Sequence, residues 1–522
     1  MTLNSITKYA RSILVFISLW WIAPMHATEN PQHPKTKLTL KQGSLIGLAH
    51  DNVSRFYNIP YAHNPFIGKR RFQAPEAYST WHGILDATTL GQPVPQPSRG
   101  KQVELVGAVG DLTLNVWAPT AAIKSAKKLP VMVWIPGGAF IRADAGEQVY
   151  NGSSFASHEV IVVTVNYRVG VDGFMHLAGA PDNRGILDQI MALQWVQDNI
   201  ADFGGDPQEV TLFGQSAGAE SVAILLGTSK AAGLFNKAIM QSPPMESLTQ
   251  KQAAAISRSF AEKLAVAATI EGISTVDWTE LVSTVIDMGN ALKDREQWGM
   301  LSWGGTAFLP VVDDDMITGS PMQSLANNAD PSINVVVGST DQESRLYMVP
   351  SGAIDKITPA VTALFLKDLS LSGDPLSTYT EANKGQSDGE IFVKIQSDYT
   401  FRMPAQHIAK HLLNNGNKVW HYNFSWFSPA FGGRLGPAHF VDVPFAFNTI
   451  DSDQAKAFVG SQPPKALAQQ MHHEWLSLAK SGAVNWSPYN RVTRPTMRFD
   501  TESKQVNDPD KSVRELWRKY PY

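Results

Sequence analysis

The chain has 522 residues, of which 43% are hydrophobic and 17% charged, so it has the composition and length of a globular protein with a large core. Its formal net charge is −3 at pH 7 and no sustained basic run occurs, which excludes nucleic acid as an expected partner. The lack of cysteine excludes a thiol nucleophile, a thiolate metal site and a lipidated cysteine.

The first 27 residues have the pattern of a secretory signal peptide. Lys8 and Arg11 precede the apolar run "SILVFISLWWIAP", and Ala27 is the small residue at the expected cleavage point. The run is shorter than the roughly 20 residues that span a bilayer, so we expect no stable membrane anchor after cleavage. A cysteine-free exported chain is typical of the bacterial periplasm or of a secreted bacterial protein.

Apolar runs with strand character alternate with helical patterns along the rest of the chain. Several of them are rich in Val and Ile, as in strands that are buried on both faces of a parallel sheet. One helix is indicated by apolar residues that recur at helical spacing in "ILDQIMALQWVQDNIADFG". The strand-like runs are "KLTLKQGSLIGLAH", "FYNIPYA", "DLTLNVWAP", "LPVMVWIP", "VIVVTVNYR", "EVTLFG", "AIMQSP", "INVVVGST" and "KVWHYNFSWF". This alternation predicts an α/β fold with a central, mostly parallel sheet flanked by helices.

Two stretches depart from this alternation. From roughly 245 to 330 and from 350 to 415 the pattern is mainly helical and lacks buried-strand runs. We interpret both stretches as helical insertions that cover one end of the sheet. Residues 28–522 are therefore predicted to form a single domain.

Two pentapeptides, "GQSAG" and "GQSDG", match G-x-S-x-G, the pattern of a serine nucleophile on a sharp turn between a strand and a helix. Ser216 stands between the strand "EVTLF" and the helix "AGAESVAILL", which is the required context. Ser387 follows the polar "STYTEANK", and Asp388 would put a negative charge where an oxyanion must form. Ser216 is therefore the candidate nucleophile, and the second pentapeptide is interpreted as a surface loop.

A glycine-rich loop, Pro136–Phe140, follows the strand "VMVWI". Small residues let the main chain approach a substrate oxygen closely. We expect N–H groups of this loop and the N–H of Ala217 to form an oxyanion hole.

The base should be a histidine that follows Ser216 in the chain. His439 lies on a Gly/Pro loop just past a strand, where catalytic residues are common. The other candidates lie in helical or strand patterns: His407, His411, His421, His472 and His473. His407 and His411 could form half of a metal site, but a solvated helix face is the favoured interpretation. The acid that orients the base should be Asp341 or Glu343, between which the pattern does not choose.

A series of longer motifs follows in order along nearly the whole chain after the signal segment. Among them are "RRFQAPEAYSTWHGILDAT", "VMVWIPGGAF", "NYRVGVDGF", "FLPVVDDDMI", "GSTDQES" and "GPAHFVDVPFAF". The stretch "NRGILDQIMALQWVQDNIADFGGDPQEVTLFGQSAGAESV" is the most specific. Together these motifs resemble the type-B carboxylesterase/lipase family of α/β-hydrolases.

The resemblance implies a serine carboxylesterase that hydrolyses small-molecule esters through an acyl-enzyme and needs no metal or organic cofactor. It implies Ser216 as nucleophile, His439 as base and Glu343, not Asp341, as the acid. The oxyanion donors that it implies are the N–H groups of Gly138, Ala139 and Ala217.

Some positions depart from the family pattern. Pro136 and Ala139 replace a histidine and the third glycine of the loop, and both changes keep the main-chain donors. Val109 replaces an acidic residue, so Arg71, whose counterpart pairs with that acid, must find another partner or face water.

The first disulfide of the family is also missing, because Val94 and Asp111 replace its cysteines. No tryptophan lies between them, so the cation-binding tryptophan of cholinesterases has no counterpart, and choline esters are not the expected substrate.

Three alternatives remain open from the sequence. A long-chain lipase would need an apolar lid, for which the amphipathic "KQAAAISRSFAEKLAVAATI" is a candidate. A non-catalytic binding member of the fold would lack the serine or the histidine, whereas all three triad positions are filled here. Cleavage of a carbon–halogen bond would need a carboxylate at the position of Ser216.

Overall fold

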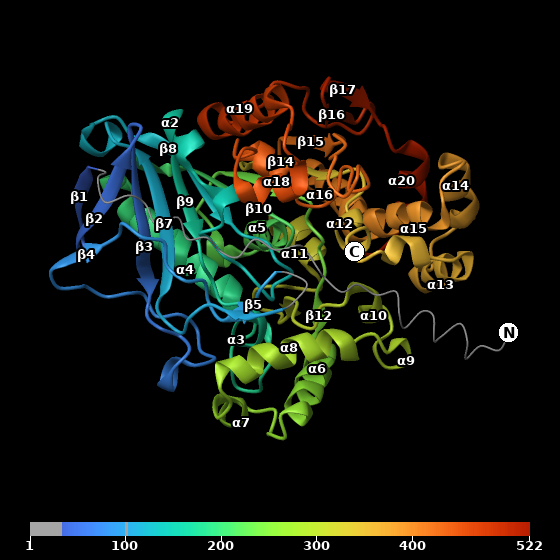
Figure 1. The fold of residues 1–522 in the computed structure, drawn as a ribbon, viewed down its shortest axis with the longest axis horizontal. Helices are drawn as coiled ribbons and strands as arrows, with labels where there is room; N and C mark the ends of the chain where they lie inside the picture. Colours follow the sequence, from blue (N-terminus) through green and yellow to red (C-terminus); the bar gives the residue numbers. More distant parts are fainter. Residues whose placement is uncertain (1–33, 100–102) are drawn as a thin grey trace.

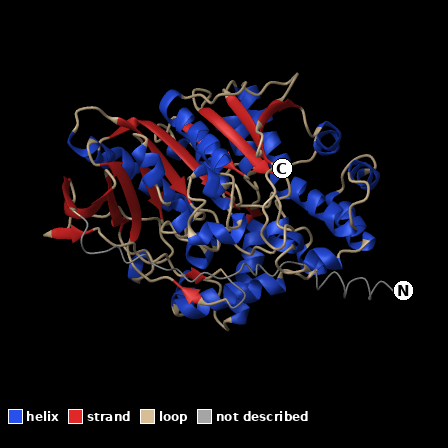
Figure 2. Cartoon of the chain, turned by 45° about the horizontal axis from the view of Figure 1, so that its top comes forward, coloured by secondary structure: helices blue, strands red, loops and turns tan. Residues whose placement is uncertain are grey.

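Within the described part of the chain, thirteen strands form one large sheet that runs through the molecule (Figures 1 and 2). The computed structural model describes residues 34–99 and 103–522, so the predicted signal peptide, residues 1–27, lies outside the described residues. In order across the sheet the strands are β1 (Lys35–Leu40), β2 (Gly43–His50), β3 (Val53–Ala62), β7 (Leu112–Pro119), β9 (Ile161–Val165), β8 (Leu129–Ile135), β10 (Gly205–Gln215), β11 (Lys237–Gln241), β14 (Asn334–Thr340), β15 (Val419–Phe424), β16 (Pro495–Phe499) and β17 (Lys504–Asn507), with β4 (Ile84–Asp86) paired to β2.

The centre of the sheet is parallel. Every neighbouring pair from β9 to β16 is parallel, whereas β1, β2, β3 and β7 at one edge and β17 at the other pair antiparallel. All residues of β9, β11 and β15 are buried, as expected for strands in the parallel centre of a sheet. The predicted mostly parallel sheet is therefore confirmed, and β10 lies at its centre between β8 and β11.

Helices cover both faces of this sheet. Along β8, Val131, Val133 and Ile135 pack into one core cluster, whereas Met132 and Trp134 pack into another on the opposite face. The first cluster includes residues of α4 (Arg184–Asn199), α5 (Ala217–Leu226), α11 (Pro321–Asn328) and α16 (Met403–Asn415). The second includes residues of α2 (Ser153–Ser157), α17 (Val443–Ala446), α18 (Asp453–Val459) and α19 (Lys465–Ser481). Strand side chains alternate between the two faces, so both faces are buried.

Most helices of the two mainly helical stretches lie beside the sheet, whereas α11 and α16 pack against one of its faces (Figure 1). One group of helices lies at the bottom of that view and the other at its right. The first stretch holds α6 (Gln250–Lys263), α7 (Ile270–Ser274), α8 (Trp278–Ala291), α9 (Arg295–Trp298) and α10 (Leu301–Gly304). The second holds α13 (Pro359–Leu369), α14 (Pro375–Ala382), α15 (Asp388–Ser397) and α16, and it packs with α20 (Lys511–Trp517) around a third apolar cluster. The assignment of both stretches as insertions of a single domain stays a prediction.

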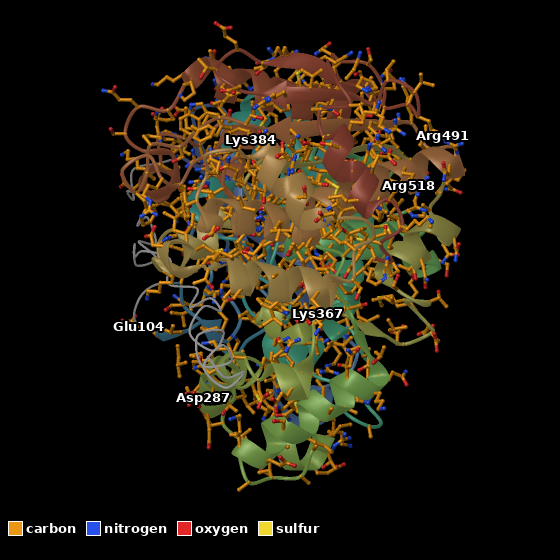
Figure 3. All side chains as sticks on the ribbon, turned by 90° about the vertical axis from the view of Figure 1, so that its right-hand side faces the viewer. Glu104, Asp287, Lys367, Lys384, Arg491 and Arg518 are labelled. Carbon is orange, nitrogen blue, oxygen red and sulfur yellow. The ribbon has the colours of Figure 1, made fainter. Side chains whose placement is uncertain are left out.

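Charged side chains of both signs cover the outside of the molecule. Figure 3 labels six of them, all exposed: Glu104, Asp287, Lys367, Lys384, Arg491 and Arg518. Within residues 34–99 and 103–522, no helix has the length and apolar character that crossing a membrane requires.

Candidate active site

Ser216 lies on the tight turn that joins β10 to α5. Its φ of 58° and ψ of −130° are strained for a residue with a side chain, and its N–H donates to the carbonyl of Gln241 on β11 at 2.9 Å. The flanking glycines permit the turn. A Cβ on Gly214 would lie 2.5 Å from the main chain of Gly218, and one on Gly218 would lie 2.0 Å from the carbonyl oxygen of Ile135. The turn presents Ser216 at the N-terminus of α5, where the helix dipole favours a developing anion.

The glycine-rich loop lies directly beside this turn. A Cβ on Gly137 would lie 2.3 Å from the carbonyl oxygen of Gln215 and 3.0 Å from Cβ of Ser216. The next two residues, Gly138 and Ala139, have φ values of 142° and 55°. Gly138, Ala139 and Ser216 line one small cavity, and Ala139, Ser216 and Ala217 line a second one beside it. The three predicted oxyanion donors are thus gathered around Ser216.

His439 and Glu343 form a buried pair. Nδ1 of His439 lies 2.5 Å from Oε2 of Glu343, and the N–H of His439 donates to the carbonyl of Glu343 at 3.0 Å. The other carboxylate oxygen, Oε1, accepts from Ser242 Oγ at 2.6 Å and from the N–H of Thr340 at 2.7 Å. These bonds hold the carboxylate in one orientation, with a single oxygen facing the ring.

Asp341, the other acid that the pattern left open, points elsewhere. Its carboxylate accepts from Ser425 Oγ at 2.7 Å and from Arg498 at 3.4 Å. The structure therefore brings Glu343, and not Asp341, to His439.

Gln215 is a site residue that the sequence interpretation missed. Its Nε2 lies 2.9 Å from Nε2 of His439, and among the described residues no hydrogen bond joins His439 to Ser216. Because Nδ1 faces a carboxylate, the neutral ring carries its proton there, and its Nε2 accepts from the Gln215 amide. The only available signal was the position of Gln215 next to Ser216 in "GQSAG".

The remaining candidate histidines lie apart from Ser216. His407 and His411 are on α16, and burial lowers the pKa of His407 to about 4. His421 is buried in β15, with Nδ1 3.2 Å from Thr496 Oγ1. His472, on α19, has Nδ1 2.8 Å from the carbonyl of Ala446. Across the part of the chain that the structure describes, no group of three or more His, Asp or Glu side chains is arranged to hold a metal ion.

Ser387 has a structural place in the fold. It is exposed and caps the N-terminus of α15, where its Oγ accepts from the N–H of Glu390 at 3.3 Å. The second pentapeptide therefore lies at the exposed start of a largely buried helix, and among the described elements no strand leads into it.

Arg71 has found other partners in place of the acid that Val109 replaces. Its guanidinium donates to the carbonyls of Ser274, at 2.9 Å, and Val276, at 3.3 Å. It also lies 3.8 Å from the carboxylate of Asp172.

Ser216 lies between two small cavities that differ in charge. We name the first the His439-side cavity; its lining includes His439, Arg99, Arg142, Leu346, Phe440 and Phe458. We name the second the α5-side cavity; its lining includes Ala217, Glu220, Glu246, Leu309, Trp303 and Phe401. Burial and the nearby Arg99 lower the pKa of Arg142 to about 10, so both guanidinium groups remain charged at neutral pH. Tyr347 borders both cavities.

Comparison with known proteins identifies the family. The model of the carboxylesterase family matches residues 34–517. The para-nitrobenzyl esterase of Bacillus subtilis (strain 168) is 34% identical over 498 residues, covering 92% of this chain and 97% of the relative. The phenmedipham hydrolase of Pseudarthrobacter oxydans is 30% identical over 456 residues, covering 84% and 89%.

Solved structures agree with this assignment. The Geobacillus stearothermophilus carboxylesterase EST55 superimposes with a TM-score of 0.82 at 30% identity, covering 92% of this chain and 100% of that one. A PNB esterase structure gives a TM-score of 0.76 at 33% identity and covers 92% and 99%. The chain therefore belongs to the carboxylesterase family and is a serine carboxylic ester hydrolase with the α/β-hydrolase fold.

Proposed function

We propose that this carboxylesterase works through an acyl-enzyme on Ser216, with His439 as general base and Glu343 as the acid that orients it. The observation that carries the proposal is the geometry: a serine on a strained turn and a histidine held by a buried carboxylate line one cavity. As Ser216 Oγ attacks the ester carbonyl, Nε2 of His439 takes its proton. This step requires the Ser216 hydroxyl to take the place of the Gln215 amide at Nε2.

The tetrahedral intermediate carries its negative charge on the former carbonyl oxygen. The N–H groups of Gly138, Ala139 and Ala217 are proposed to stabilise it, and the loss of one such donor typically costs about 10²–10³ in rate. His439 then gives its proton to the leaving alcohol. Water attacks the acyl-enzyme, His439 takes a proton from it, and the acid product and free Ser216 are released.

We further propose small soluble esters as substrates. Apolar and aromatic side chains, Leu346, Phe440 and Phe458, line the His439-side cavity and suit an aromatic alcohol. The relatives named for para-nitrobenzyl esters support the same substrate class. Arg99 and Arg142 in this cavity oppose a cationic alcohol, in line with the expectation that choline esters are not preferred.

The test is hydrolysis of p-nitrophenyl esters from acetate to palmitate by the wild type, Ser216→Ala and Ser387→Ala. We expect the highest kcat/KM on short chains, loss of at least about 10³-fold in kcat with Ser216→Ala, and wild-type rates with Ser387→Ala. Rates that rise steeply toward palmitate would instead establish a lipase. Activity that survives Ser216→Ala would overturn the assignment of the nucleophile.

Export is proposed from the sequence alone. The basic start, apolar run and small residue at position 27 support cleavage after Ala27 and delivery to the periplasm or the medium. N-terminal sequencing of the protein from cell fractions should find Thr28 first; a full-length chain in the cytoplasm would contradict export.

A further inference from the structure

The proposed mechanism assigns each half of the ester to one cavity. His439 must protonate the leaving alcohol, so the alcohol has to lie in the cavity that His439 lines. The α5-side cavity is lined by Ser216 and the oxyanion residue Ala217 but not by His439. The acyl group therefore extends into the α5-side cavity.

The α5-side cavity contains one carboxylate that has no well-formed hydrogen bond to any described residue. Glu220 lies four residues after Ser216, on the same side of α5, and its exposed fraction is 0%. Neither carboxylate oxygen has a hydrogen-bond partner of acceptable geometry among the described residues, although Glu220 lines the cavity. Buried carboxylates are ordinarily paired, so this one lacks the partner that its position demands.

A second carboxylate, Glu246, lines the same cavity. Burial raises the pKa of Glu246 to about 7. Burial also raises the pKa of Glu220 well above its ordinary value; the Glu246 carboxyl adds to this rise, and the main-chain N–H of Glu246 offsets part of it. Among the residues that the structure describes, no Lys, Arg or His contributes to either shift in pKa. Burial thus favours the protonated form of both carboxyl groups.

Other polar groups of the cavity are neutral at working pH. Tyr347 has its pKa raised, chiefly by burial, and Thr306, Gln396 and Thr400 carry no charge. Trp303 and Phe401 supply aromatic walls, and such rings also attract cations.

We propose that the α5-side cavity is a specificity site for acyl groups that carry a protonated amine, with the carboxylates of Glu220 and Glu246 as its ligands. This inference rests on the proposed function, because the mechanism determines which half of the ester enters the cavity. An ammonium group has three N–H donors and provides both the hydrogen bonds and the charge that Glu220 lacks. Its binding favours the deprotonated form of both carboxyl groups.

The test compares matched pairs of 4-nitrobenzyl esters at pH 8. Each ω-aminoalkanoate, from 3-aminopropanoate to 6-aminohexanoate, is compared with the alkanoate that is one carbon longer, so that CH₃ replaces NH₃⁺. We expect the amino ester of at least one length to be hydrolysed with a kcat/KM about tenfold or more above its partner. Charge-assisted hydrogen bonds contribute about 1.5–3 kcal/mol, which corresponds to roughly 10–100-fold.

Three variants test whether Glu220 and Glu246 cause the preference for amino esters. Glu220→Gln and Glu246→Gln should each lower the amino-to-alkyl ratio of kcat/KM about tenfold or more, whereas Glu262→Gln, at an exposed position of α6, should leave the ratio unchanged. A wild type that prefers the alkanoate at every length would overturn the proposal while leaving the esterase function intact. A ratio that is unchanged by Glu220→Gln would overturn it equally.

Measuring binding to a variant that cannot turn over the ester tests the amine site independently of the proposed reaction. Calorimetry of 4-nitrobenzyl 5-aminopentanoate with Ser216→Ala should give a Kd about tenfold or more below that with Ser216→Ala/Glu220→Gln. This difference is expected even if the wild type hydrolyses no ester in the series, and equal Kd values would refute the site.

Discussion

At the residue scale, the bond between His439 and Glu343 decides which ring nitrogen can act as a base. With Nδ1 2.5 Å from Oε2 of Glu343, the proton of the neutral ring stays on Nδ1 and Nε2 keeps its lone pair. Ser242 and the N–H of Thr340 hold the second carboxylate oxygen, so the carboxylate does not rotate away from the ring. The tautomer that the mechanism needs is thus set by one carboxylate, which two neighbours hold in place.

We expect Glu343→Gln to lower kcat by about 10⁴ with little change in folding, because an amide can donate to Nδ1 and stabilise the wrong tautomer. The kcat for p-nitrophenyl acetate, with circular dichroism as a check on folding, measures this. Asp341→Asn is the matched control, because Asp341 lies two residues away and contacts Ser425 and Arg498 instead. A larger loss of kcat in Asp341→Asn would mean that the acid has been assigned wrongly.

At the element scale, the close fit of β10, α5 and the glycine-rich loop positions the serine. Three glycines form this fit: Gly137, Gly214 and Gly218 each face main-chain atoms at distances that no Cβ tolerates. The registers of β10 against β8 and β11 place the same turn between the ends of both neighbours, with Gly214 opposite Ile135 and Gln215 opposite Gln241. The position of Ser216 therefore depends on contacts between main-chain atoms, which cannot adjust as a flexible side chain can.

Gly218→Ala tests this fit, because its Cβ would lie 2.0 Å from the carbonyl oxygen of Ile135. We expect the free energy of unfolding in urea to fall by about 3 kcal/mol, together with most of the activity. Gly110→Ala is the control: a Cβ there meets nothing within 4 Å, so the change should stay within about 0.5 kcal/mol. Equal stability of the two variants would show that the turn is less tightly packed than the structure indicates.

At the scale of the whole molecule, buried histidines make the fold sensitive to acid. Burial lowers the pKa of His407, His421 and His472 to about 4 in the folded protein, against about 6.5 in an unfolded chain. Between these values the unfolded chain binds more protons, so these groups reduce stability as the pH falls from 6.5 toward 4. Asp442 acts in the opposite direction, because burial and Glu343 raise its pKa to about 6.

These histidines and Asp442 have opposite effects on how stability depends on pH. The contribution of one histidine is therefore measured as the difference between the wild type and a variant that lacks it. His421 is buried in β15 and its Nε2 has no partner among the described residues. From pH 6 to pH 5, we expect the wild type to lose about 1.2 kcal/mol more unfolding free energy than His421→Gln, which corresponds to slightly less than one proton. Urea unfolding at both values measures this, and parallel losses would show that His421 is protonated in the folded state.

Much of the architecture could be predicted from the sequence, because the signals are local. The apolar runs of β8 to β11, the helical spacing in α4 and the glycines around Ser216 each lie within a short segment, where pleat, helix period and turn sterics act. The same context separated Ser216 from Ser387, since only one of them follows a buried strand. The motifs around these elements also carried the resemblance to the family and, with it, the choice of Glu343.

The tertiary structure decided what depends on residues that are distant in the chain. The pattern alone left Asp341 and Glu343 open, because two carboxylates in one loop differ only in where the chain 96 residues later places His439. The new partners of Arg71 come from a segment about 200 residues away, and Gln215 reaches a ring that is 224 residues distant. Glu220 belongs to a helix whose residues are all buried, and segments that are distant in the chain, among them α10 and α15, enclose the cavity beside its carboxylate. Sheet order and loop packing create these contacts, and no local spacing encodes them.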